Sequence, residues 1–168
     1  MSLGKNNSNY SNLAKLFHWG FVAIFIYGIA KQVEDLKQLE DISFLRFEMI
    51  FGSIFLILLV TRFVYMKKTQ KSSLPEATPI FQKKIAKLVH NGMYFLLAVT
   101  ALSGLLIGML YWFAMNNGFL INLLISIHEL VINLLYWFIG VHIVAATYHR
   151  LRRDGVWSSM VPFLKEKK

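Results

Sequence analysis

Five histidines are the residues of this chain best suited to chemistry, and two of them have an informative spacing. His128 and His142 lie fourteen residues apart. On an α-helix this separation is a rise of about 21 Å, and it returns the second side chain to within about 40° of the first. Two imidazoles on one face of a helix, one near each end, can each hold a flat cofactor. The other histidines are His18, His90 and His149.

The composition restricts what these histidines can serve. The chain has 168 residues, of which 56% are hydrophobic and 16% charged, whereas soluble domains average about 45–50% and about 25%. A soluble enzyme and a disordered chain are therefore not expected. The absence of cysteine excludes disulfides, thiolate metal sites and thiol-attached haem. The net charge of +9 does not predict nucleic-acid binding, because the basic residues flank apolar segments rather than form one face.

Four apolar segments are long enough to cross a bilayer as helices. They lie at about 16–33, 49–66, 85–113 and 119–148. No internal repeat or second domain is visible, so the whole chain, 1–168, reads as one unit. The sequence predicts an all-α, integral membrane four-helix bundle in contact with the lipid bilayer.

The basic residues predict the orientation of this bundle. Six lysines lie between positions 67 and 87, and further Arg and Lys residues follow position 149. Lys and Arg near helix ends stay on the cytoplasmic side. Both termini are therefore expected in the cytoplasm, and the protein in the cell inner membrane. A cleavable signal peptide is not expected, because polar Asn and Ser precede the first apolar segment.

This orientation places His18 and His142 at matching depth on different helices, with His128 toward the outer side. A haem b iron takes an axial imidazole from one helix and usually a second from across the bundle. The matched pair therefore predicts a bis-histidine iron site. The simpler alternative is that these histidines hydrogen-bond neighbouring helices. Zinc is less favoured, because no tight cluster with a carboxylate or thiol is visible.

Three segments together resemble the bacterial cytochrome b561 family, which is akin to the cytochrome b subunits of formate dehydrogenases and nickel hydrogenases. They are LFHWG at His18, HNGMYFLL at His90, and HELVINLLYWFIGVHIVAATYHR from His128. The resemblance implies a four-helix di-haem protein in which His18 and His142 hold the cytoplasmic haem b. It implies that His128 holds the outer haem together with a histidine of the second helix.

The sequence departs from the family pattern at that second-helix position, which carries Glu48. A carboxylate is a hard oxygen donor and does not replace imidazole in tuning an iron potential. Three arrangements remain open: a carboxylate-ligated or five-coordinate outer haem, a different ligand, or no outer haem. The alternative interpretation is that Glu48 is an ordinary carboxylate at the membrane interface, with no role at a haem.

Three further residues are candidates near the cytoplasmic haem. Arg62, at a position where the family tends to have arginine, is suited to a haem propionate, and its alternative is a snorkelling side chain. His90 is a candidate donor to a propionate or a quinone carbonyl, or a plain helix-end histidine. His149 would supply a proton for quinone reduction.

These features lead to three functional hypotheses. The first is a b-type cytochrome that transfers electrons between an outer-side donor and the quinone pool, with ubiquinone as the candidate quinone. The resemblance implies superoxide as a candidate donor, hence a quinone-linked oxidoreductase, although the acidic first connection (Glu34, Asp35, Glu40 and Asp41) would repel that anion. The second is a cytochrome subunit anchoring a larger dehydrogenase or hydrogenase through an electron-donor protein. The third is a non-redox membrane protein that uses its histidines for proton or metal passage.

Overall fold

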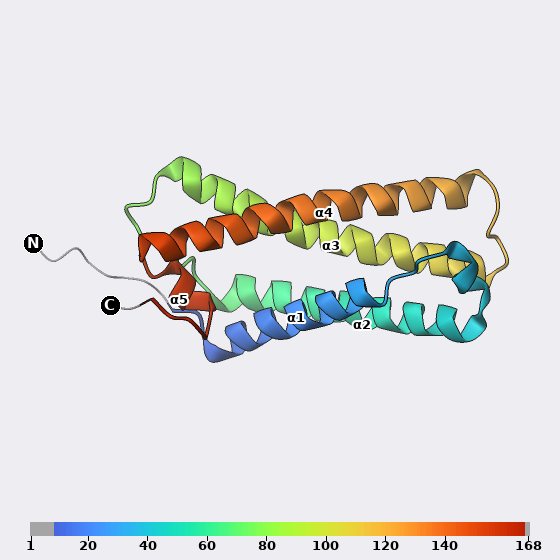
Figure 1. Cartoon of the computed structure of the whole chain (residues 1–168), viewed down its shortest axis with the longest axis horizontal. Coiled ribbons are helices and arrows are strands. Elements are labelled where there is room, and N and C mark those ends of the chain that lie inside the picture. The colour runs from blue at the N-terminus through green and yellow to red at the C-terminus, as the bar shows by residue number, and fades with distance from the viewer. Residues whose placement is uncertain (1–8, 167–168) are drawn as a thin grey trace, which may run out of the picture.

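The computed structural model describes residues 9–166 of the chain. Four long helices form the molecule: α1 (Asn12–Ala30), α2 (Ile42–Thr69), α3 (Ile80–Trp112) and α4 (Phe119–Arg152). Two short elements accompany them, the 3-10 helix η1 (Leu36–Glu40) and helix α5 (Val156–Met160). Figure 1 shows the long helices side by side, with the start of α1 and the end of α4 at one end of the bundle. We call this the terminal end, where α1 begins and α4 ends, and we call the other the η1 end.

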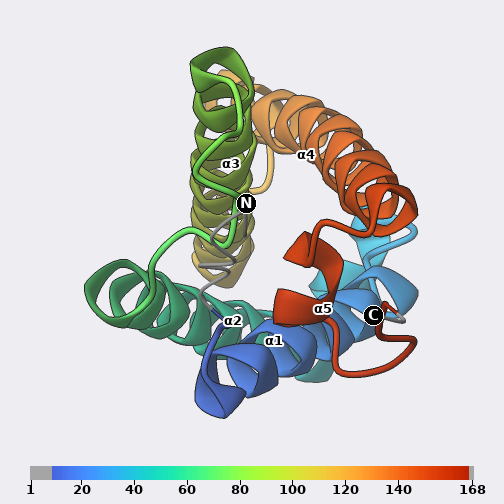
Figure 2. The same ribbon diagram turned by 90° about the vertical axis from the view of Figure 1, so that its left-hand side faces the viewer.

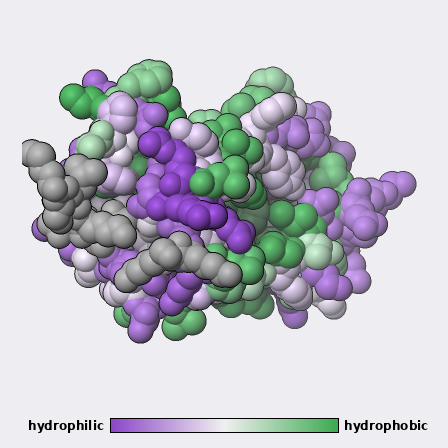
Figure 3. All heavy atoms as spheres, turned by 60° about the vertical axis from the view of Figure 1, so that its left-hand side comes forward, coloured by the Kyte–Doolittle hydropathy of each residue, from purple (hydrophilic) through white to green (hydrophobic). Residues whose placement is uncertain are grey.

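All four long helices are long and apolar enough to span a membrane. The described chain is therefore the all-helical four-helix membrane bundle that the sequence predicts. Figure 3 shows hydrophilic side chains gathered at the terminal end, with hydrophobic side chains on the flank behind it. Such a surface is expected for helices that meet lipid along their length and water at their ends.

Two helix ends differ from the limits of the apolar segments, and at the start of α2 a side chain satisfies the backbone. The side chain of Asp41 accepts from the amides of Ser43 and Phe44, so α2 begins at Ile42 rather than near residue 49. Conversely, α1 ends at Ala30, three residues before the expected limit of 33. The hydrophobic segments mark what lies in lipid, whereas the caps mark where the hydrogen-bond ladder stops.

Packing is strongest around α3, which lies between α2 and α4. One apolar cluster occupies the middle of the bundle and includes Phe21, Phe55, Leu97 and Leu135. A second cluster, at the η1 end, joins Leu39, Leu45, Ile107 and Ile121. Leu135 is midway in sequence between His128 and His142, so the central cluster separates two histidine levels on α4.

Helix α5 lies across the terminal end, between the ends of α1 and α4 (Figure 2). The indole of Trp19 in α1 donates to the carbonyl of Met160, at 3.2 Å. The ring centre of Trp19 is also 5.0 Å from that of Phe163. The C-terminal segment is thereby attached to α1 beside His18.

Candidate functional site

Three histidines from three helices meet near the terminal end. The ring centres of His18 (α1) and His142 (α4) are 6.4 Å apart, at an interplanar angle of 64°. The ring centre of His90 (α3) is 5.0 Å from that of His142, at 79°. His18 and His142 are half-buried, and His90 is more exposed. The antiparallel course of the helices thus brings together residues that are far apart in sequence.

Arg62 of α2, the remaining long helix, lies beside the three histidines. Its guanidinium donates to Nδ1 of His18 at 2.8 Å and lies over the rings of Phe21 and Tyr94, 5.7 and 5.1 Å from their centres. Its Nε is buried and has no hydrogen-bond partner. Within residues 9–166 no carboxylate pairs with it. A cation in this position, with a spare donor and aromatic walls, is suited to bind an anionic group.

The hydrogen-bond partners of Nδ1 in His18 and in His90 determine which ring nitrogen of each histidine carries the proton. A guanidinium only donates, so Nδ1 of His18 is an acceptor. A carbonyl only accepts, so Nδ1 of His90 carries a hydrogen and donates to Ala86 at 2.7 Å. In neutral His90 the remaining nitrogen is an acceptor. Donation from His90 to a propionate or quinone would therefore require its cationic form.

His128 occupies a second level, on the η1 side of the central apolar cluster. Its Nδ1 is 2.8 Å from the hydroxyl oxygen of Ser103 in α3. A Cβ placed on the next residue, Gly104, would lie 3.2 Å from Cε1 of the His128 ring. The imidazole therefore rests directly against the backbone of α3.

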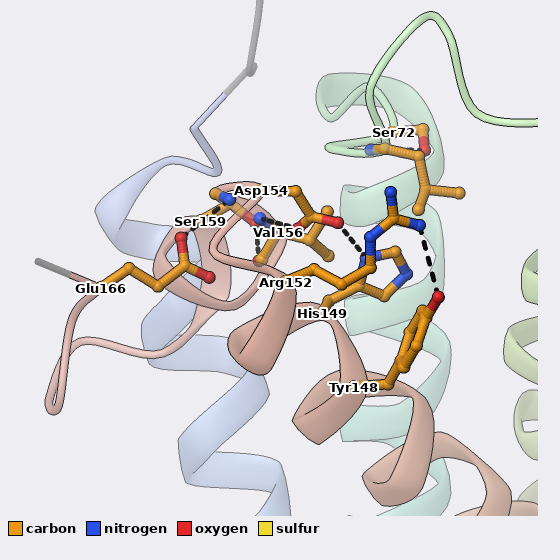
Figure 4. A network of polar contacts seen from close by, with 10 residues as sticks. Ser72, Tyr148, His149, Arg152, Asp154, Val156, Ser159 and Glu166 are labelled. Carbon is orange, nitrogen blue, oxygen red and sulfur yellow. Dashed lines mark hydrogen bonds and ion pairs between the residues drawn. The ribbon is translucent and has the colours of Figure 1, made fainter. Parts of the chain in front are cut away.

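Glu48 and His149 lie apart from the three grouped histidines. Glu48 is half-buried in α2, and no hydrogen bond or ion pair within the described residues joins it to His128. Nδ1 of His149 is 2.6 Å from Oδ2 of Asp154. Figure 4 shows His149 within a polar network that leads toward α5 and Glu166.

An apolar cavity of about 470 Å³ lies near the η1 end. None of the predicted site residues lines it; its lining consists of Arg46, Met49, Ile50, Met109, Trp112 and Phe113.

The sequence model of prokaryotic cytochrome b561 matches residues 9–163 of this chain. The chain belongs to the prokaryotic cytochrome b561 family. No curated protein and no solved structure matched it. Membership in the family, together with four apolar spans, makes this a multi-pass membrane cytochrome of the b type that binds haem and takes part in electron transfer.

The terminal-end group fits the haem b that membership in the cytochrome b561 family implies. With metal–nitrogen bonds of about 2 Å, two imidazoles on opposite faces of one metal have ring centres about 6 Å apart. The 6.4 Å between His18 and His142 matches this spacing, whereas the 5.0 Å between His90 and His142 is too short. In residues 9–166 no three His, Asp or Glu side chains are arranged to hold a metal ion. A haem iron needs only one or two protein ligands.

Two contacts of this cytochrome were not expected from its sequence. Tyr94 lies beside Arg62, and Ser103 beside His128. A signal for Ser103 exists, because Ser103 lies nine residues before the end of α3 and His128 nine residues after the start of α4. In an antiparallel helix pair, equal distances from the connecting loop place two residues at one depth. The sequence does not show which way each helix is rotated.

Proposed function

We propose that this cytochrome holds one haem b between His18 and His142 and passes electrons between a donor outside the cytoplasm and ubiquinone. The observation that carries the proposal is the 6.4 Å separation of the two imidazole centres, which suits axial ligands on opposite faces of one iron. The buried, unpartnered Nε of Arg62 supports it, because a haem propionate would supply the missing anion.

Each side chain has a separate role in this proposal. His18 and His142 would hold the iron through Nε2, a role that needs a proton on each Nδ1. Nδ1 of His18 accepts from Arg62, so in the haem-bound protein Arg62 would bond the propionate in place of His18. A bound haem supplies reversible one-electron chemistry at its iron. The aromatic rings of Phe21 and Tyr94 beside Arg62 exclude water from the propionate end.

We further propose a second haem at His128, with this imidazole as its one strong protein ligand. Nδ1 of His128 is engaged by Ser103, which leaves Nε2 for iron. Glu48, at the position where the family pattern has a histidine, makes no hydrogen bond or ion pair with His128 within the described residues. With one protein imidazole as its strong ligand, the iron of such a haem would be high-spin. The two levels would then have different spectra.

We propose that both termini face the cytoplasm, as the lysines between residues 67 and 87 favour. The donor would then approach the η1 end. Asp35 and Asp41 cap helices there and, with Glu34 and Glu40, make the surface acidic. A donor protein with a basic face suits this charge better than superoxide. His149, bonded to Asp154 at the opposite end, is the proposed proton source for ubiquinone reduction.

The test is a comparison of His18→Ala with His90→Ala in the full-length protein. Both variants remove an imidazole that faces His142, so they are matched. Haem per chain is measured by pyridine haemochrome, and ferric spin state by electron paramagnetic resonance. We expect His18→Ala to abolish the low-spin bis-imidazole signal and His90→Ala to retain it.

The opposite pattern would assign the ligand to His90 and overturn this ligand pair. A colourless wild-type protein, with no reducible Soret band, would reject the electron-transfer proposal in favour of a non-redox role. Copurification of a second polypeptide after mild detergent extraction would instead favour the subunit of a larger dehydrogenase or hydrogenase.

A further inference from the structure

The contact between Ser103 and His128 joins α3 to α4 and is partly buried. The two side chains approach to 2.8 Å between Oγ and Nδ1, and Ser103 is 4% exposed. The same hydroxyl oxygen lies 2.7 Å from the carbonyl oxygen of Val99 and 3.1 Å from that of Thr100. Three polar atoms thus surround one hydroxyl, which has a single hydrogen to donate.

The two carbonyls determine the direction of the bond to His128. Carbonyl oxygens only accept, so they compete for the hydroxyl hydrogen of Ser103. If that hydrogen pointed at His128 instead, the hydroxyl oxygen would face the Val99 carbonyl oxygen at 2.7 Å with no hydrogen between them. The Val99 carbonyl, the Ser103 hydroxyl and Nδ1 of His128 are all satisfied when Ser103 donates to Val99 and accepts from Nδ1–H of His128.

This direction sets the tautomer of His128. With its proton on Nδ1, the neutral ring has its lone pair on Nε2, which is the form that binds a metal through Nε2. The state differs from that of His18, whose Nδ1 accepts from Arg62. His128 is therefore prepared for ligation without any change of hydrogen-bond partner.

Gly104 adds a steric component to the same arrangement. A Cβ at this position would approach the His128 ring to 3.2 Å, closer than an ordinary van der Waals contact. The glycine allows the imidazole to lie against α3 while Ser103, one residue earlier, holds its Nδ1. The serine and the glycine together fix both the height and the rotation of the ring.

We propose that Ser103 is a positioning residue that fixes the tautomer and orientation of His128 as an axial haem ligand. The inference rests on the proposed second haem. Metal-bound histidines characteristically donate their other ring N–H to a protein acceptor, which orients the ring and raises its basicity. Loss of such a partner weakens metal binding by about 10- to 100-fold.

The test uses Ser103→Ala, with Ser103→Thr as rescue and Ser53→Ala as a control for the loss of a serine-to-carbonyl bond. Ser53 is exposed and also donates to the carbonyl four residues earlier, that of Met49, at 2.8 Å, but within the described residues no hydrogen bond joins it to a histidine. The readouts on purified protein are haem per chain, the midpoint potential of the high-spin haem, and its ferrous iron–histidine stretching frequency in resonance Raman spectra. That frequency reports the hydrogen bond at Nδ1 directly.

We expect Ser103→Ala to lower the iron–histidine frequency, raise the midpoint potential and weaken haem retention at this level by about tenfold or more. Ser103→Thr and Ser53→Ala should resemble wild type. If Ser103→Ala matches Ser53→Ala in frequency and potential, Ser103 is only a helix–helix contact and the inference is wrong. If His128→Ala leaves the haem content and the high-spin signal intact, the second haem itself is rejected, which is a separate failure.

Discussion

The two histidine levels on α4 differ in the number of helices that converge on them. At the terminal end, His142 faces His18 of α1 and His90 of α3, and Arg62 of α2 binds His18. At the second level, His128 is held from α3 through Ser103. One helix presents both imidazoles, so the neighbouring helices determine what each can do.

The two levels therefore differ in how their histidines are arranged to bind a metal. The terminal-end group has several imidazoles and a spare cation, so it can bind a metal from two sides and neutralise an anionic substituent. The His128 level has one imidazole in a fixed tautomer and suits a single strong bond. Two cofactors on one helix would therefore have distinct spin states and potentials, although their primary ligands are the same residue type.

Among substitutions that test the difference between the two histidine levels, His142→Ala is expected to have the largest effect on haem content and spin state. Removal of this residue deletes the α4 ligand of the terminal-end pair, so the low-spin signal should disappear. His128→Ala should remove the high-spin signal and leave the low-spin signal in place. Haem quantitation together with electron paramagnetic resonance of both variants measures this. Loss of both signals in His128→Ala would show that the two levels are not independent.

A smaller effect is expected from Arg62→Gln. The substitution removes a positive charge near the terminal-end haem. Loss of this charge stabilises the ferric state relative to the ferrous state, so the midpoint potential of the low-spin component should fall. It also leaves a propionate without its cation, so haem retention should fall. Redox titration of the α band measures the first effect.

Arg46→Gln is the matched control for this substitution. Arg46 lies over the ring of Trp112, 5.6 Å from its centre, near the η1 end. The Arg46→Gln substitution should leave the midpoint potential of the low-spin haem unchanged. An equal shift in both variants would mean that Arg62 acts through general charge and not through a propionate.

The four spans and the matching depth of the histidines follow from the sequence, because hydrophobic length and helical rise are local properties. The contact between Arg62 and His18 does not follow, because it depends on how α1 and α2 are rotated about their axes. The same is true of Ser103, whose depth is available from the sequence and whose facing is not. Helix α5 was missed because five residues carry too little periodicity to distinguish a helix from a loop.

The smallest predicted effect compares two glycines of α3 that each face a ring of α4. A Cβ at Gly92 would lie 2.3 Å from the ring of Phe138, whereas a Cβ at Gly104 would lie 3.2 Å from that of His128. Phe138 is one helical turn from His142, so Gly92→Ala should disturb the terminal-end level and Gly104→Ala the His128 level. Overpacking of this kind costs about 1–3 kcal/mol, less the helix propensity that alanine gains over glycine.

Gly140→Ala is the control, because no atom lies within 4 Å of its added Cβ. Thermal unfolding in detergent should place Gly92→Ala below Gly104→Ala, and both below Gly140→Ala. The spectra then separate packing from ligation: Gly92→Ala should broaden the low-spin signal, and Gly104→Ala the high-spin signal. Identical spectral changes in the two variants would indicate that α3 and α4 shift as one body. The levels would then share a packing unit despite their different ligand environments.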